Sequence, residues 1–168
     1  MDLEALPRED LINLVKIYSR NWLAHDGCWF LAAEERHGLK EAMELDRAAW
    51  ARFAPAEARR IMEAFRIPHG GGLWSLGRAL EYRLYATINR QECQAVDDHL
   101  MRFRMLECRV QATREQKGLP AFPCRAVGLV EYSEFARAVD PRIETRCLHA
   151  PPDPVSSSYC EWEFALPQ

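Results

Sequence analysis

The stretch LMRFRMLEC (100–108) shows where the hydrophobic pattern of this 168-residue chain changes. Its side chains alternate between apolar and basic: Met101, Arg102, Phe103, Arg104 and Met105. A period of two is typical of a strand that buries one face and exposes the other. The segment VDDHL (96–100) has the composition of a hairpin turn, so we expect 90–96 to form a partner strand. The stretch therefore predicts an antiparallel sheet.

The residues before this stretch follow a helical period instead. Their apolar side chains recur at steps of three or four, as on one buried helix face. We expect Gly27 to bend or interrupt the first helix, Gly38 to end it, and Pro55 to open another. PHGGG (68–72) should break the pattern completely. Residues 1–89 are therefore predicted to form a helical N-terminal part.

The residues after the stretch return to strand patterns twice. Apolar and charged side chains alternate again over 142–147 and 159–166, while 109–117 and 130–138 carry helical patterns. We therefore predict that 90–168 contains a small antiparallel sheet with short helices of its own. The fold class is α+β, with the helical part and the sheet packed as one compact unit.

Composition limits the classes of function. The net charge of -3 and the pI near 6.0 argue against binding to nucleic acid, which requires a basic face. No apolar run approaches the roughly 20 residues of a membrane helix. The N-terminal segment MDLEALPRED is acidic and unlike a signal peptide, so we expect a cytoplasmic protein. The sequence contains no P-loop, dinucleotide fingerprint or HExxH motif.

Six cysteines are the main chemical feature of the chain. Their wide, irregular spacing and the expected cytosolic location predict free thiols. Pro123 fits a first helical turn, which would place Cys124 at a helix N-terminus, where a thiolate is stabilised and the thiol pKa is lowered. Arg125 would add to this effect, so Cys124 is a candidate nucleophile. Cys147 and Cys160 fall in the apolar phase of their strands, which also suits buried core residues.

A metal site is the alternative reading of these cysteines. Cys108, Cys124, Cys147 and Cys160 could close a tetrahedral zinc site, and His149, in phase with Cys147, could replace one ligand. None of them forms a CxxC pair. Zinc is the cofactor that this reading implies.

Arginines are frequent around the predicted sheet and can grip a carboxylate through two parallel hydrogen bonds. We therefore expect a small anionic ligand, with most of these arginines serving as solvated partners of glutamates. A further reading is a homodimer formed by the helical part, which exposed side chains of Trp22, Trp29 and Trp50 would indicate.

Most of the chain resembles a family of small uncharacterised bacterial cytosolic proteins. Three segments carry the resemblance: MLECRVQATREQKGLPAFPCRAVGLVEYSEFARAVDPRIETRC (105–147), YCEWEF (159–164) and, upstream, NWLAHDGCWFLAAEERHG (21–38). The C-terminal half in turn resembles the L-2-amino-thiazoline-4-carboxylic acid hydrolase-like family, and it is similar to vinyl-reductase-type small-molecule-binding domains. In that family a strand ending in Cys leads to a helix and Gly, a second Cys follows, and the last strand begins Cys-Asp-Phe. The matching positions here are Cys108, Gly118, Cys124 and Cys160, with Glu161-Trp162 replacing Asp-Phe. Glu131 is the nearest substitute for an acidic residue after the second Cys, and Cys147 is an addition.

The resemblance implies a small-molecule-binding protein, with a thiol-dependent hydrolase of a small carboxylated heterocycle as the preferred interpretation. Cys124 would be the nucleophile, or would share that role with Cys108 or Cys160. Glu131 or His149 would be the general base. Arg109 or Arg125 would bind the carboxylate, and Trp162 would line the site. The alternative function is a non-catalytic sensor module that binds a metal or a ligand through the cysteines.

Overall fold

The computed structural model describes residues 1–154 and 157–167. The chain divides into two compact units, Met1–Ala42 (unit 1) and Met43–Gln168 (unit 2). The division predicted at residue 89 stays a prediction. In chain order the elements are α1 (Arg8–His37), α2 (Leu39–Phe65), α3 (Gly72–Leu80), the short 3-10 helix η1 (Leu84–Thr87), β1 (Arg90–Asp97), β2 (Leu100–Glu107), α4 (Arg109–Gln116), α5 (Arg125–Val139), β3 (Glu144–His149) and β4 (Cys160–Ala165).

The first two helices are longer than the sequence pattern predicts. Helix α1 runs through Gly27 without a break and ends where Gly38 adopts a φ of +81° and donates to the carbonyl of Glu34 at 2.8 Å. Glycine keeps its backbone N–H, so inside a helix it costs only about 1 kcal/mol. Pro55 lies inside α2 and does not open a new helix. Its lost hydrogen bond is offset by the buried face that Ala54 and Ala58 form around it.

The PHGGG connector between α2 and α3 breaks the helical pattern, as predicted. Gly70 and Gly72 adopt φ values of +73° and +65°, which L side chains rarely reach. The fully buried Asp140 accepts hydrogen bonds from the N–H of Gly72 at 2.9 Å and from Nη2 of Arg142 at 2.7 Å. The hydrogen bonds from Arg142 hold the pKa of Asp140 well below its ordinary value. One buried carboxylate thus fixes the connector to the end of α5.

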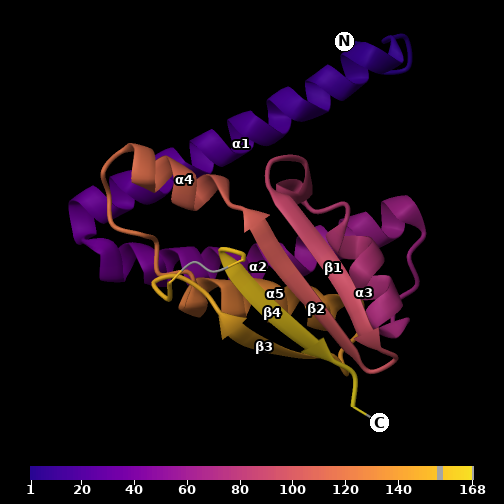
Figure 1. Cartoon of the computed structure of the whole chain (residues 1–168). Helices are drawn as coiled ribbons and strands as arrows, with labels where there is room; N and C mark the ends of the chain where they lie inside the picture. Colours follow the sequence, from indigo (N-terminus) through magenta and orange to yellow (C-terminus); the bar gives the residue numbers. More distant parts are fainter. Residues whose placement is uncertain (155–156, 168) are drawn as a thin grey trace. The chain divides into compact units, whose positions relative to one another are not determined.

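The four strands of the described residues form one antiparallel sheet in the order β1-β2-β4-β3, and the α+β prediction is confirmed. The predicted hairpin is present, since β1 pairs with β2. On the buried face, Phe103 lies opposite Trp162 and Met105 lies opposite Cys160. Helix α5 lies against this face (Figure 1) and buries Tyr132 and Phe135. No helix of the described residues is both long and apolar enough to cross a membrane.

The opposite face of the sheet carries paired charges. Arg104 pairs with Glu92, and Arg102 lies 3.9 Å from Glu163. Arg146 bonds the same Glu163 at 2.6 Å. The expectation that sheet arginines serve as partners of glutamates is therefore confirmed for this face.

Gly128 allows the closest approach between α5 and the sheet. A methyl group at this position would lie 2.6 Å from Cζ2 and 2.9 Å from Cη2 of Trp162. The indole ring is 1% exposed and packs against the ring of Tyr132, with the ring centroids 4.7 Å apart. The absence of a side chain at Gly128 therefore sets how deeply Trp162 enters the core.

Candidate functional site

Three of the cysteines converge in unit 2 at the beginnings of α4, α5 and β4. Cys108 follows β2 and precedes α4, Cys124 directly precedes α5, and Cys160 is the first residue of β4. All three are free thiols of intermediate exposure. Burial is the largest cause of the raised pKa of Cys124, and the nearby Cys108 and Cys160 raise it further. We refer to these three residues together with Glu131 as the thiol cluster.

Gln111 fixes the position of Cys124. Its Nε2 donates to Sγ of Cys124 at 3.0 Å and to the carbonyl of Phe122 at 2.8 Å. Its Oε1 accepts the N–H of Phe122 at 3.0 Å. The buried amide of α4 thus holds the chain that leads into α5 by three hydrogen bonds, which orients the thiol.

Glu131 lies on the buried face of α5, one residue before Tyr132. It pairs with Arg83, whose side chain is fully buried. Nε of Arg83 also lies 3.4 Å from Glu57 of α2, and its guanidinium lies 5.1 Å from the ring centroid of Phe135. Burial lowers the pKa of Arg83, but the two carboxylates raise it further, so the net change is upward. A buried arginine thus links α2, η1 and α5 beneath the thiol cluster.

The three thiols are protonated at neutral pH. Burial raises the pKa of Cys108, raises that of Cys160 to about 12, and raises that of Cys124 well above its ordinary value. The Glu131 carboxylate raises all three further. The prediction that the helix N-terminus lowers the pKa of Cys124 is therefore wrong, because loss of solvent outweighs the helix dipole. The hydrogen bond from Gln111 lowers the pKa of Cys124, but its effect is smaller than that of burial.

The residues predicted to bind substrate lie around this cluster in different environments. Arg109 and Arg125 begin α4 and α5 and are exposed. Arg125 pairs with Asp153. Burial raises the pKa of Cys147, and the charge of Arg125 opposes this only in part. Trp162 is buried, and its Nε1 donates to Sγ of Cys160 at 3.2 Å. The arginines therefore lie at the surface, and Trp162 lies beneath the cluster.

The predicted zinc centre is not formed. Over residues 1–154 and 157–167, no group of three or more His, Cys, Asp or Glu side chains could hold a metal ion. Cys147 lies on β3 opposite Trp162, and the His149 ring bonds the carbonyl of Ser158 at 3.0 Å. Cys108, Cys124, Cys147 and Cys160 are far apart in the chain. The fold brings three of them near one another, but not into an arrangement that could hold a metal ion.

The tryptophans expected at a dimer surface differ in exposure. Trp29 of α1 is 68% exposed, and Trp22 is half-buried. Trp50 is buried and stacks on Tyr85, with the centroids 5.8 Å apart. Trp50 therefore belongs to the core of unit 2, contrary to that expectation.

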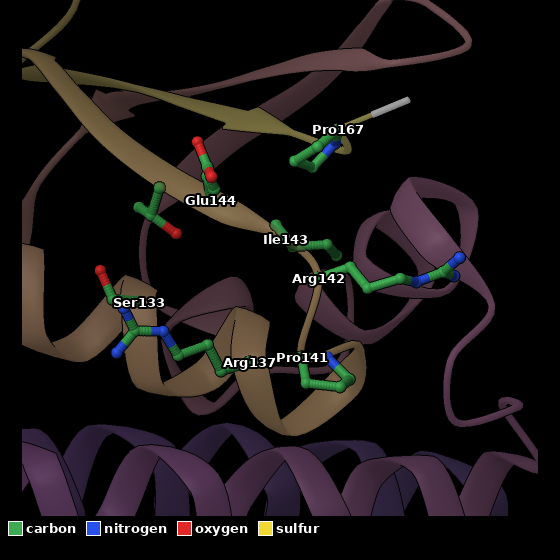
Figure 2. A pocket seen from close by; sticks show the side chains of 8 residues that line it. Ser133, Arg137, Pro141, Arg142, Ile143, Glu144 and Pro167 are labelled. Carbon is green, nitrogen blue, oxygen red and sulfur yellow. The ribbon is translucent and has the colours of Figure 1, made fainter.

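A separate cleft of about 780 Å³ lies between the C-terminal half of α5 and the start of β3. In Figure 2, Ser133 and Arg137 lie on the helix, and Arg142 points away from both. Arg137 pairs with Glu134. The lining residues are Ser133, Arg137, Pro141, Arg142, Ile143, Glu144, Thr145 and Pro167. This lining contains none of the predicted site residues, so we do not take the cleft as the functional site.

Sequence reasoning missed Gln111, Arg83 and Tyr132 as parts of the site. Gln111 falls in an ordinary helical pattern, and nothing in its neighbours indicates a buried amide. Arg83 had a weak signal, because it is a lone cation between the apolar residues of EYRLYA (81–86). Tyr132 falls in the apolar phase of the helical pattern at 130–138, but its proximity to the thiols depends on tertiary packing.

The fold and the cluster together define an α+β domain with a buried arginine–carboxylate network under three neutral thiols. A family model described as "Family of unknown function (DUF6125)" matches residues 4–166. The chain belongs to this family, and the family assigns it no reaction. Searches of curated proteins and of solved structures give no match.

Proposed function

We propose that unit 2 binds a small carboxylated heterocycle at the thiol cluster and hydrolyses a C–N or C–S bond in it. The observation that carries the proposal is the meeting of three free thiols, Cys108, Cys124 and Cys160, where β2, α5 and β4 come together. Glu131 is near enough to raise the pKa of each of them. Partly exposed thiols with a carboxylate nearby are the pattern of nucleophilic catalysis. The six free thiols support a reducing, cytoplasmic setting.

In this mechanism Cys124 is the nucleophile, because Gln111 orients its sulfur, and Cys108 or Cys160 shares the role. Glu131 is the general base. The exposed Arg109 binds the substrate carboxylate, and Arg125 does so after leaving Asp153.

The raised thiol pKa values determine the order of events. No thiolate is present at rest, so the Cys124 proton moves to Glu131 as the S–C bond forms at the electrophilic carbon. The C–N or C–S bond then breaks, and the leaving heteroatom takes that proton. Water attacks the covalent intermediate, releases the product and restores the thiol.

The experiment is a comparison of Cys124→Ser with Cys147→Ser on a panel of five-membered heterocyclic carboxylates. Thermal unfolding reports binding, and product analysis reports hydrolysis. We expect Cys124→Ser to keep the ligand-induced stabilisation and to lose turnover by at least about 100-fold, while Cys147→Ser keeps both. Serine variants of Cys108, Cys124 and Cys160 that all keep full turnover would refute the thiol mechanism.

One observation favours a second function, a non-catalytic ligand-binding module. Burial raises the pKa of Cys160 to about 12 and keeps the other two thiols neutral, which suits a site that binds without reacting. In that case the ligand raises the unfolding temperature of the wild type and of Cys124→Ser equally. No product forms with either protein.

A further inference from the structure

Strand β1 forms one edge of the sheet (Figure 1). It pairs with β2 and with no other strand of residues 1–154 and 157–167. Most of its side chains are exposed, including Val96 at 47%. An edge strand presents N–H and C=O groups that can pair with a strand of another chain. The edge is therefore a surface on which a further strand can be added.

Hydrogen bonds at the two ends of β2 show which backbone groups of β1 are free. The carbonyls of His99 and Met105 accept the N–H groups of the residues that flank β4, at 2.9 and 2.8 Å. The N–H and C=O of one strand residue point to the same side, and those of the next residue point to the opposite side. Odd-numbered residues of β2 therefore point toward β4, and even-numbered residues point toward β1.

The register of the hairpin transfers this alternation to β1. Glu92 and Gln94 lie opposite the even-numbered residues 104 and 102 of β2, so their backbone groups are used in the hairpin. The N–H and C=O groups of Gln91, Cys93 and Ala95 therefore point away from the sheet. These three residues are arranged symmetrically, with Cys93 at the centre.

Irregular pairing limits this free segment at both ends. The register shifts between Arg90 and Gln91, and again between Ala95 and Asp97. Bulges of this kind bend a strand and interrupt regular pairing. Only the short segment 91–95 can therefore accept a partner strand in regular antiparallel geometry.

We propose that the edge binds the same strand of a second copy of this chain, antiparallel and around a two-fold axis at Cys93. This inference goes beyond the function proposed above and is independent of it. The arrangement uses all the free backbone groups, because Gln91 faces Ala95 of the second copy and Cys93 faces its own equivalent. The side chains also match, since the Glu92 carboxylate faces the amide of Gln94 of the second copy, which can donate to it.

Charge and symmetry select this arrangement over others. Pairing centred on Glu92 would set this carboxylate against its own equivalent, and like charges directly opposite one another are destabilising. Pairing centred on Gln94 would extend past the bulge between Ala95 and Asp97. Because both copies use the same edge, the contact closes as a dimer and does not grow into a fibre. A pairing this short buries less surface than a standard interface, so we expect a dissociation constant in the micromolar range.

The test is sedimentation of the full chain over a series of concentrations, with two variants at Cys93. Cys93→Pro removes the N–H that the dimer uses and the hairpin does not, and proline is tolerated on an edge strand whose N–H faces solvent. Cys93→Ala is the matched control, because it loses the thiol and keeps the N–H. We expect Cys93→Ala to dimerise like the wild type and Cys93→Pro to dimerise at least about tenfold more weakly.

A second pair of variants tests the side-chain register and does not depend on how well Cys93→Pro folds. Gln94→Glu sets a carboxylate opposite Glu92 twice in each dimer and should raise the dissociation constant by about fivefold. In the single chain the new carboxylate lies opposite Arg102, so the hairpin should keep its stability. Gln94→Lys sets an ammonium opposite Glu92 instead and should lower the dissociation constant.

Three results would overturn the proposal. The first is a wild type that stays monomeric throughout the concentration series. The second is a dimer that folded Cys93→Pro and both Gln94 variants form as well as the wild type, because the contact would then lie on another surface. The third is assembly that continues past the dimer, because a two-fold contact through one edge is closed.

Discussion

The contact between Gly128 and Trp162 gives the sharpest test of the core. Gly128→Ala places a methyl carbon 2.6 Å from Cζ2 of the indole, whereas two carbons pack best about 3.5–4.0 Å apart. The indole cannot retreat freely, because Phe103 lies opposite it on β2 and Tyr132 covers it from α5. The helix and the sheet must therefore separate by about 1 Å, or the ring must leave its position.

The magnitude is the difference between two opposing effects. Overpacking of this kind costs about 1–3 kcal/mol. Replacing a glycine in a helix interior by alanine returns about 1 kcal/mol through helix propensity. We therefore expect Gly128→Ala to lower the free energy of unfolding by up to about 2 kcal/mol and not to raise it.

Urea denaturation followed by circular dichroism measures this change. Gly77→Ala is the matched control, since Gly77 lies in α3 and its added methyl would meet only Sδ of Met101 at an ordinary 3.5 Å. That variant should be as stable as the wild type or slightly more stable. Trp162→Phe removes the ring atoms that clash, so adding Gly128→Ala to it should cost less than adding it to the wild type.

A Gly128→Ala variant that gains as much stability as Gly77→Ala would refute the reasoning. So would a double variant whose effects simply add, because the clash predicts coupling between the two sites.

Three further predictions concern buried charges and thiols. Arg83→Met removes a buried cation that two carboxylates share and should cost about 3–5 kcal/mol in urea denaturation. Arg78→Met, at an exposed pair, should cost less than about 1 kcal/mol. The folded protein lowers the pKa of Asp140, so the contribution of this carboxylate to stability is complete above its ordinary pKa of 3.8 and is lost as the pH falls. Asp140→Asn should therefore make the free energy of unfolding less dependent on pH in acid. An unchanged dependence would show that the hydrogen bonds from Arg142 contribute nothing. Alkylation of Cys160 should still rise about tenfold per pH unit near pH 10, and a plateau near pH 9 would contradict its raised pKa of about 12.

Much of the fold could be read from local patterns. The alternation at 101–105 predicts β2, and the turn at VDDHL predicts its pairing with β1, because both depend on neighbouring residues. Gly38 ends α1 for an equally local reason, its positive φ. Pro55 is a local signal for the start of a helix, whereas the burial of Ala54 and Ala58 on either side of it belongs to the folded chain, so the sequence pattern does not show that α2 continues through it.

The candidate site was predictable only in its residue types. The sequence suggested that Cys108, Cys124 and Cys160 belong together, and the fold brings them together. The state of the thiols could not be predicted, because it depends on burial and on Glu131, which lies seven residues beyond Cys124 on the buried face of α5. The partner of Glu131, Arg83, lies before the first strand and meets it only in the folded chain.

The position of β4 in the sheet has a consequence for synthesis of the protein. Among the described strands it is the last in chain order, yet it lies between β2 and β3. While the ribosome still holds Cys160–Ala165, the nascent chain has two open strand edges, and Phe103 has no partner opposite it. Completion of the sheet and arrival of the third thiol are therefore one event. A chaperone that shields β2 until Cys160–Ala165 has emerged would protect the fold and the site together.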